Sequence, residues 1–406
     1  PQFIKSAAIA RASVKLKINH KIIDTGQHYS KNMSFSFIKE LGLNKIDYCL
    51  NISKRSSVIQ LSEIIKKLES LIPKINPDYV LVYGDTNSTL AASIVCSRLK
   101  IRIAHVEAGL RSRNNEMQEE VNRILTDNLS SILFSATKEA TQNLIFERFD
   151  KKKIYQVGDV MFDSIKFFKN KLKKIQTDDY VLLTLHRAEN VDERRRLELL
   201  IDSFLKLSQK IKIILPIHPR TKKNLIKYNL FSKLKNKIKI LNPQPYLELL
   251  RLINDSKYVI TDSGGIQKEA YFLKKRCFIT RNETEWNELV EIGFNKIISP
   301  ISKNFYNSLL YEINKNVKVY HDTKLFGDGK SSEKILNVLT KKIPELIGGS
   351  ADLAGSNNTK TNNHKIIKPG NFQGNYIHYG VREHAMSGVM NGIALHSNLI
   401  PYGGTF

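Results

Sequence analysis

Four clusters of polar residues in this chain are of the types that perform acid–base chemistry. They span residues 83–89, 105–111, 119–123 and 186–190, and they carry Asp85, Glu107, Glu119 and His186. Carboxylates grouped at one cleft push each other's pKa values apart, so that one carboxyl donates a proton while another accepts it. The clusters therefore indicate a site of proton transfer to and from a substrate.

Each of the four residues also has a purely structural interpretation. Asp85 could cap a helix, and Glu119 could be a first-turn charge that the helix dipole favours. Glu107 could pair with Arg111, and His186 could be a loop histidine with its hydrogen bonds satisfied. Their shared position favours a site instead. Asp85 and Glu107 follow consecutive predicted strands, so a parallel sheet would bring them to one ligand-facing edge. His186 follows the first strand of a second unit and would lie across the cleft from them.

A fifth segment, residues 262–269, has the order of an anion-binding turn. An apolar run precedes Ser263, Gly264 and Gly265, and Glu269 lies one turn into a predicted helix. Glycines let the backbone approach a ligand, and the helix start offers free N–H groups to an anion. Glu269 is placed to accept hydrogen bonds from ribose hydroxyls. An ordinary capped helix is the alternative interpretation.

Short apolar runs alternate with amphipathic stretches along most of the chain. Predicted strands lie at residues 20–24, 79–83, 101–106, 132–135, 154–157, 180–185, 211–216, 238–241, 258–261 and 276–279. Predicted helices between them include residues 58–71, 120–129, 139–148 and 194–209. This alternation predicts an α/β fold of two doubly wound, Rossmann-like domains with a ligand cleft between them.

The predicted domains are residues 1–170 and 171–338, and a polar, lysine-rich stretch over residues 167–179 is the expected hinge. Residues 344–406 change in character, because a glycine-rich stretch is followed by polar, irregular sequence and one helical pattern. We expect this part to be an incomplete C-terminal α/β fragment.

The composition of the chain argues against a nucleic-acid-binding protein and against a membrane-spanning one. Lys and Arg number 64 against 39 Asp and Glu, which gives a net charge of +25. The lysines are scattered and no basic run alternates with aromatics, so we expect no specific nucleic-acid partner but an attraction for anionic substrates. No apolar run approaches the roughly 18 residues of a membrane span, and no leader is visible. Cys49, Cys96 and Cys277 lack metal spacing and predict buried thiols in a reducing cytoplasm.

Residues 1–338 resemble the non-hydrolysing bacterial UDP-N-acetylglucosamine 2-epimerases. The matching stretches are residues 1–5, 25–29, 83–90, 105–111, 119–127, 157–161, 186–190, 216–220, 261–270 and 327–329. The resemblance implies a glycosyltransferase-B-like fold, a homodimer, and inversion at C2 of the sugar without NAD or metal. In that family UDP leaves C1 by anti elimination, which gives 2-acetamidoglucal, and then adds back to the opposite C2 configuration.

The resemblance also implies roles for particular residues. Asp85, Glu107 and Glu119 match the acid–base carboxylates, and His186 matches the histidine of the catalytic site. The residues that match UDP contacts are Lys5, His218, Ser263, Gly264, Gly265 and Glu269. A C2 proton is weakly acidic, so a placed base and a stabilised leaving diphosphate are both required.

Three departures from the family pattern bear on these expectations. Members carry a first strand and a phosphate-binding Arg ahead of the stretch that starts at Pro1, and Gln118 replaces a common Pro. Trp286 stands where well-known members have Arg, and it resembles epimerases of UDP-2,3-diacetamido-glucuronate. Three other functions stay open: that related epimerase, an inactive sugar-nucleotide-binding remnant, and a retaining glycosyltransferase of the same fold.

Residues 344–406 resemble the start of the transketolase pyrimidine-binding domain. The stretches 348–357 and 376–386 carry the resemblance, and Glu383 matches the glutamate that binds the aminopyrimidine of thiamine diphosphate. Most of that domain and its diphosphate-binding partner are not in this sequence. We therefore expect no thiamine cofactor, a disordered or loosely docked tail, and an artefactual or decayed gene junction near residues 337–345.

Overall fold

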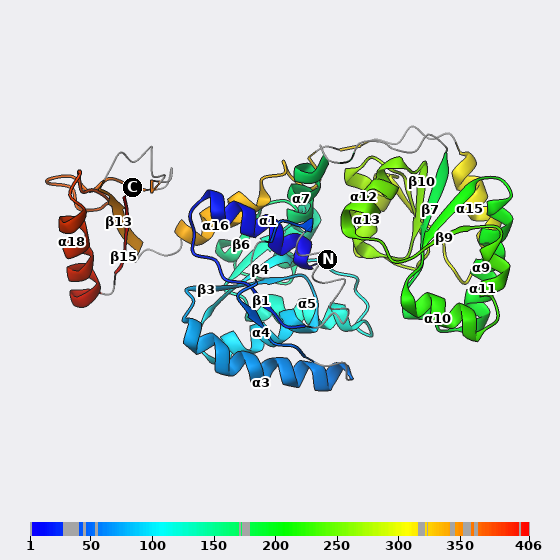
Figure 1. Ribbon diagram of the computed structural model, residues 1–406, viewed down its shortest axis with the longest axis horizontal. Helices are drawn as coiled ribbons and strands as arrows, with labels where there is room; N and C mark the ends of the chain where they lie inside the picture. The colour runs from blue at the N-terminus through cyan, green and yellow to red at the C-terminus, as the bar shows by residue number, and fades with distance from the viewer. Residues whose placement is uncertain are drawn as a thin grey trace.

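The computed structural model describes residues 2–26, 40–43, 46–52, 56–169, 172, 179–315, 321–322, 324–341, 346–351, 359–360, 364–397 and 399–405. Figure 1 shows these residues arranged as three bodies of helices and strands. The pairings between the named strands are all parallel. Parallel neighbours need crossover connections, which helices supply here. The predicted α/β class with doubly wound sheets is confirmed.

The first body contains a four-stranded sheet of order β3-β4-β5-β6 and a separate pair β1-β2. Its strands are β1 Ile23–Asp24, β2 Tyr48–Cys49, β3 Tyr79–Tyr83, β4 Arg102–Ala108, β5 Ile132–Ser135 and β6 Ile154–Gln156. Its helices are α1 Gln2–Lys15, α3 Ser57–Ile75, α4 Asn87–Arg98, α5 Gln118–Leu129, α6 Lys138–Phe146, the 3-10 helix η1 Lys151–Lys153 and α7 Val160–Phe168. A later helix, α16 Ser331–Lys341, packs back on α1 through Ile335 and Leu336.

The second body contains a six-stranded sheet of order β12-β11-β10-β7-β8-β9. Its strands are β7 Tyr180–Thr184, β8 Lys212–Pro216, β9 Lys239–Leu241, β10 Tyr258–Thr261, β11 Cys277–Ile279 and β12 Asn295–Ile297. Its helices are α8 Ala188–Val191, α9 Arg194–Ser208, α10 Pro219–Lys227, α11 Phe231–Lys235, α12 Tyr246–Asp255, α13 Gly264–Phe272, α14 Asn287–Glu291 and α15 Phe305–Asn314. The strand order reverses between β7 and β10, and ligands bind α/β sheets at the carboxyl ends of such strands.

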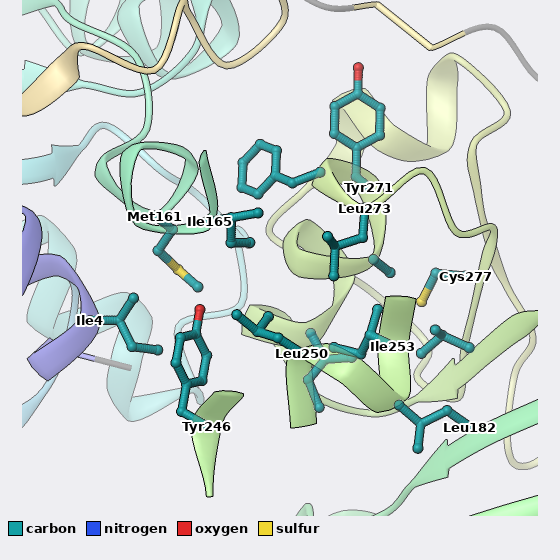
Figure 2. Close-up of a cluster of buried hydrophobic side chains, with 14 of the residues drawn as sticks. Ile4, Met161, Ile165, Leu182, Tyr246, Leu250, Ile253, Tyr271, Leu273 and Cys277 are labelled. Atoms are coloured by element: carbon teal, nitrogen blue, oxygen red, sulfur yellow. The ribbon is translucent and has the colours of Figure 1, made fainter. Parts of the chain in front are cut away.

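Helices near the boundary of these two bodies share one apolar core. Ile4 on α1 and Met161 on α7 belong to the same buried cluster as Tyr246 and Leu250 on α12, and Figure 2 shows these side chains together. Continuous apolar packing across the boundary fixes how the carboxyl ends of the two sheets face each other.

A cavity of about 420 Å³ lies between β1 and β3. Apolar side chains from both strands line it, including Ile23, Val80 and Leu81. One end of the cavity reaches Thr25 and Thr86, which lie at the carboxyl edge of the sheet beside Asp85.

The third body contains the strands β13 Leu346–Ser350, β14 Tyr376–His378 and β15 Ile400–Gly404 with the helix α18 Glu383–His396. The strands pair in the order β14-β13-β15, and in Figure 1 this body stands apart from the other two. We predicted a disordered or loosely docked tail. Backbone pairing gives the described residues a fold of their own, so disorder is wrong for them, whereas loose docking is not contradicted. Phe372, Val381 and Leu395 remain largely exposed.

Several details differ from the sequence-based predictions. The strand expected at residues 20–24 is confined to β1, and β12 was not predicted, because its sequence Asn-Lys-Ile is not an apolar run. Cys49 is exposed, so the prediction of a buried thiol is wrong there; Cys96 and Cys277 are buried, and all three are free.

Residues 27–29, and most of the expected hinge at 167–179, lie outside the described residues. No helix in the described part of the chain combines the length and apolarity needed to cross a lipid bilayer.

Candidate active site

Two carboxylates lie at the carboxyl ends of adjacent strands in the first body. Asp85 follows β3, and Glu107 lies near the end of β4, where the pairing register with β5 shifts. Glu107 has φ of 77°, the left-handed region that non-glycine residues rarely adopt. Gly84 between the two strand ends has φ of 61°, and a Cβ there would lie 2.8 Å from the side-chain amide of Gln2. The positive φ favours glycine at this position, and a larger residue would also displace the ends of the Gln2 and Lys5 side chains.

Glu107 lies between two ammonium groups. One carboxylate oxygen pairs with Lys5 on α1, and the other accepts a hydrogen bond from Lys268 Nζ on α13 at 2.6 Å. Burial disfavours the charged carboxylate, but Lys268 and Lys5 outweigh it and lower the pKa of Glu107 to about 2. Lys5, which the sequence resemblance assigns to UDP, is thus engaged with a carboxylate. Arg111, the alternative partner of Glu107, pairs with Asp127 and Glu147 instead.

Asp85 has a different environment. Its Oδ2 accepts a hydrogen bond from Arg123 Nε on α5 at 3.1 Å, and a third of its side chain is exposed. Burial raises the pKa of Asp85, Arg123 and Lys5 oppose this, and the charges of Glu107 and Glu285 add to it. Asp85 is not the residue that caps α4, because Thr86 occupies that position. The pKa values of two neighbouring carboxylates are therefore moved in opposite directions, the arrangement expected of an acid–base pair.

A buried hub beneath the two carboxylates holds the strand ends in place. Asp127 accepts hydrogen bonds from the backbone N–H of Gly109 at 3.1 Å and pairs with His105 Nδ1 at 2.6 Å. His105 Nε2 in turn lies 2.8 Å from the carbonyl of Gly84. Arg111 Nη2 completes the hub at 2.8 Å from Asp127. Gly84 precedes Asp85 and Gly109 follows Glu107 closely, so Asp127 ties both site segments to α5.

The second body contributes two histidines and a buried aspartate. Asp262, at the end of β10, accepts hydrogen bonds from the backbone N–H groups of His186 at 3.0 Å and Arg187 at 2.9 Å. His186 Nδ1 lies 3.2 Å from Asp262 Oδ1, and the ring of His186 is 5.5 Å from that of His218. Burial opposes the charge of Asp262, but His186 holds its pKa below the usual range. Burial and His186 also lower the pKa of His218, which favours a neutral ring there.

The start of α13 carries an internal anion. A Cβ on Gly264 would lie 2.0 Å from Glu285 Oε1, whereas Gly265 has open space around it. Arg281 Nη1 donates a hydrogen bond to Glu285 Oε2 at 2.7 Å. Burial alone would raise the pKa of Glu285, but the charges of Arg281, Arg187 and Arg123 outweigh burial and lower it. A helix N-terminus surrounded by arginines is a site for an anion. In this structure the carboxylate of Glu285 lies there, next to Ser263, the N-cap residue of α13.

Glu269 is also buried on α13. Burial raises its pKa to about 7, and it lies beside Tyr246 and Asp159. A ribose hydroxyl at this place would meet a carboxyl that changes charge near neutral pH.

Two predicted site residues are not joined to this arrangement. Glu119 lies exposed in the first turn of α5, and no hydrogen bond or ion pair with another described residue holds its side chain. Its neighbour Glu120 is buried instead and pairs with Arg123 at 2.7 Å. Glu383 is exposed on α18 in the third body, where it accepts a hydrogen bond from Thr405 at 3.1 Å.

Four further residues of the site were not predicted from the sequence: Arg123, Asp127, Lys268 and Glu285. Arg123 stands in the cluster 119–123, and Lys268 stands in the segment 262–269, so both lie within stretches that the sequence had marked.

A second carboxyl contact joins α6 of the first body to α14 of the second. Thr137 donates a hydrogen bond to Glu288, and Glu139 lies close enough to repel its charge; Asn287 Nδ2 is 3.4 Å from Glu139. Burial is the larger cause and Glu139 adds to it, and together they raise the pKa of Glu288 to about 7. The folded protein therefore holds a proton that the unfolded chain releases near pH 4.3.

We expect the free energy of unfolding to fall by about 1–3 kcal/mol as the pH rises from about 4.5 to 7, because the folded state binds more protons in this window. Urea unfolding of Glu288→Gln should show a flatter pH dependence than the unchanged chain. Glu291→Gln, an exposed change on the same helix, is the control and should leave the profile as it was. Identical profiles for the first variant and the unchanged chain would contradict this expectation.

Comparison with known proteins identifies what this arrangement is similar to. Residues 11–340 match the family model described as UDP-N-acetylglucosamine 2-epimerase, and residues 329–406 match that of the transketolase pyrimidine-binding domain. A UDP-N-acetylglucosamine 2-epimerase of Methanocaldococcus jannaschii is 42% identical over 84% of this chain and 96% of its own length. A UDP-2,3-diacetamido-2,3-dideoxy-D-glucuronate 2-epimerase of Pseudomonas aeruginosa is 40% identical over 84% and 97%.

Solved structures agree with these matches. The M. jannaschii epimerase in complex with UDP-GlcNAc and UDP superimposes with a TM-score of 0.78 at 42% identity, over 83% of this chain and 96% of that one. The Neisseria meningitidis epimerase bound to UDP-GlcNAc gives a TM-score of 0.74 at 30% identity, over 84% and 97%.

Proposed function

This chain belongs to the UDP-N-acetylglucosamine 2-epimerase family, and from that premise we propose that it inverts C2 of UDP-N-acetylglucosamine to give the manno epimer. The observation that carries the proposal is the pair Asp85 and Glu107, whose pKa values move apart at adjacent strand ends facing α13. Related enzymes named for this activity, at 42% identity and with a similar fold, support it.

The proposed chemistry assigns each group a task. A carboxylate removes the C2 proton while UDP leaves C1, and a carboxyl on the other face returns a proton to C2 of the intermediate 2-acetamidoglucal before UDP adds back. Asp85, Glu107 and Glu119 are the proposed acid–base groups, and His186 completes the catalytic set. Glu119 would have to turn from solvent toward the substrate to take part.

The proposed UDP contacts lie mostly in the second body. Ser263, Gly264 and Gly265 at the N-terminus of α13 are the proposed contacts of the diphosphate, which would have to displace the carboxylate of Glu285 from Gly264. Glu269 is the proposed contact of the ribose, and His218 and Lys5 are further proposed UDP contacts. Backbone N–H groups at a helix start stabilise a leaving diphosphate, which lowers the barrier to elimination. We further propose a domain division at about residues 170 and 338, from the lysine-rich stretch between the units, although α16 at the end of the second unit packs on α1 of the first body. The family resemblance supports a homodimer, and the unpaired cysteines support a cytoplasmic location. We propose no thiamine chemistry at Glu383.

Proton NMR of the purified chain with UDP-N-acetylglucosamine in heavy water tests the proposal. The expected result is a new manno anomeric signal together with deuterium at C2, because the proton that returns comes from solvent. UDP binding without any exchange at C2 would indicate a sugar-nucleotide-binding remnant and would refute the proposed reaction.

A second substrate has a specific observation in its favour. Trp286 is buried in the site region, and a relative that is 40% identical acts by name on UDP-2,3-diacetamido-2,3-dideoxy-D-glucuronate. The same NMR experiment with that nucleotide distinguishes the two candidates by which C2 proton exchanges faster.

A further inference from the structure

A buried lysine joins the two bodies at the carboxylates of the site. Lys268 on α13 has 1% of its side chain exposed, and its ammonium lies 2.6 Å from Glu107 Oε1 and 2.5 Å from Asp159 Oδ2. Both carboxylates belong to the first body, whereas α13 belongs to the second. A lysine this deeply buried is retained only when its charge is matched, as it is here by two opposite charges.

The partners of Lys268 are themselves fixed. Asp159 caps α7, with Oδ1 accepting from the N–H of Met161 at 2.7 Å, and its own N–H donates to the carbonyl of Phe326 at 3.0 Å. The ring of Trp286 lies under the ammonium, 4.0 Å from Nζ to its centroid. The face of an indole attracts a cation, so Lys268 is held from three sides.

Trp286 presents an uncharged aromatic face to the Lys268 ammonium. A positively charged side chain at this position would instead repel the ammonium in a buried site. The aromatic face accommodates the lysine, and the two residues therefore act as a matched pair.

Glu107 depends on this pair for its state. Its carboxylate is buried, its backbone is in the strained left-handed region, and its two oxygens meet Lys5 and Lys268 separately. Without Lys268 one oxygen would lose its cation, and the carboxylate would gain a proton more easily and turn more freely.

We propose that Lys268, supported by Trp286, is a positioning residue of the reaction, which holds Glu107 ionised and aligned when α13 is packed against the first body. The proposal rests on the proposed epimerase function. According to this proposal, packing of α13 from the second body, where UDP is expected to bind, determines the charge and orientation of Glu107 in the first body.

Three variants test this assignment: Lys268→Met, Lys268→Arg and the control Lys257→Met, whose lysine forms a surface pair with Asp179. For Lys268→Met we expect kcat to fall about 100-fold with little change in KM, since misplacing a reacting group is enough for such a loss. The acid limb of the kcat/KM profile should also move up by about one pH unit. Lys268→Arg should restore the position of the limb, and the control should match the unchanged chain. An acid limb that stays in place in Lys268→Met overturns the proposal, even if kcat falls.

If Lys268→Met does not fold, Trp286→Leu provides the test instead. This variant keeps the charges of Lys5, Lys268, Glu107 and Asp159 and removes only the aromatic contact of the lysine. We expect this variant to lower kcat about tenfold and to move the acid limb in the same direction. A profile identical to that of the unchanged chain overturns the proposal.

Urea unfolding separates failure of this inference from failure of the proposed reaction. The lowered pKa of Glu107 contributes stability above about pH 4.3, and this contribution is lost as the pH falls toward 2. The difference in unfolding free energy between the unchanged chain and Lys268→Met should therefore shrink from pH 7 to pH 3. If no epimerisation is found but this difference shrinks, Lys268 still controls Glu107; a difference independent of pH overturns the inference whatever the chain catalyses.

Discussion

Glu107→Gln should lower the rate of the proposed C2 inversion by about 10²–10⁴-fold, the usual contribution of a positioned acid or base. The amide has the size of the carboxylate but cannot accept the C2 proton, and it no longer balances the charges of Lys5 and Lys268. UDP affinity should fall less, because among the described residues Lys5 is the one proposed UDP contact that pairs with Glu107. Exchange of the C2 proton in heavy water and calorimetric titration with UDP measure the two effects separately.

Glu198→Gln is the matched control, because Glu198 pairs with Arg194 on the exposed side of α9. It should retain full exchange and full UDP affinity. A Glu107→Gln variant that exchanges C2 as fast as this control would remove Glu107 from the acid–base assignment and would move the role to Asp85 or Glu119.

Asp127→Ala should destabilise the folded protein by about 3–5 kcal/mol, the range for removing one partner of a buried ion pair. Asp127 is fully buried, and its loss removes one acceptor each from Arg111, His105 and the N–H of Gly109. Arg111 keeps Glu147 and His105 keeps the carbonyl of Gly84, so the buried hub is weakened rather than emptied. Because the same hub holds the segments of Asp85 and Glu107, we expect activity to fall even at temperatures where the variant is folded. Urea unfolding monitored by circular dichroism gives the first effect.

Asp179→Asn provides the comparison for that measurement. Asp179 is 70% exposed and pairs with Lys257 at the surface, so its change should stay within about 0.5 kcal/mol. If Asp127→Ala is no less stable than Asp179→Asn, the hub does not support the strand ends as described.

The fold was predictable because its signal is local. The predicted strands 79–83, 132–135 and 258–261 coincide with β3, β5 and β10, each an apolar run of four or five residues bounded by polar sequence. Alternation with amphipathic helices then leaves the doubly wound sheet as the arrangement that buries both faces of those strands. Two of the three residues of β12 are Asn and Lys, so it lacks an apolar run, and the two residues of β1 are too few to be bounded from sequence.

The site was predictable in part for the same reason. Asp85, Glu107 and His186 follow strands, so strand positions alone bring them to the carboxyl edges. Lys268 was not predictable, because a lysine in a helix is ordinarily solvated, and its burial arises from Glu107 and Asp159, which are 161 and 109 residues away in sequence. The difference between Glu119 and Glu120 also escaped the sequence, since only the rotation of α5 decides which of two adjacent glutamates faces Arg123.

The positive φ of Glu107 has a consequence for how this position would change under selection. The left-handed region costs a residue with a Cβ about 1 kcal/mol or more, and glycine does not carry that cost. A library of random substitutions at residue 107 that is selected only for folding stability should therefore become enriched in glycine or asparagine. Glutamate persists there only while the library is also screened for turnover, so the ratio of glycine to glutamate among survivors would report whether a given lineage still uses the site.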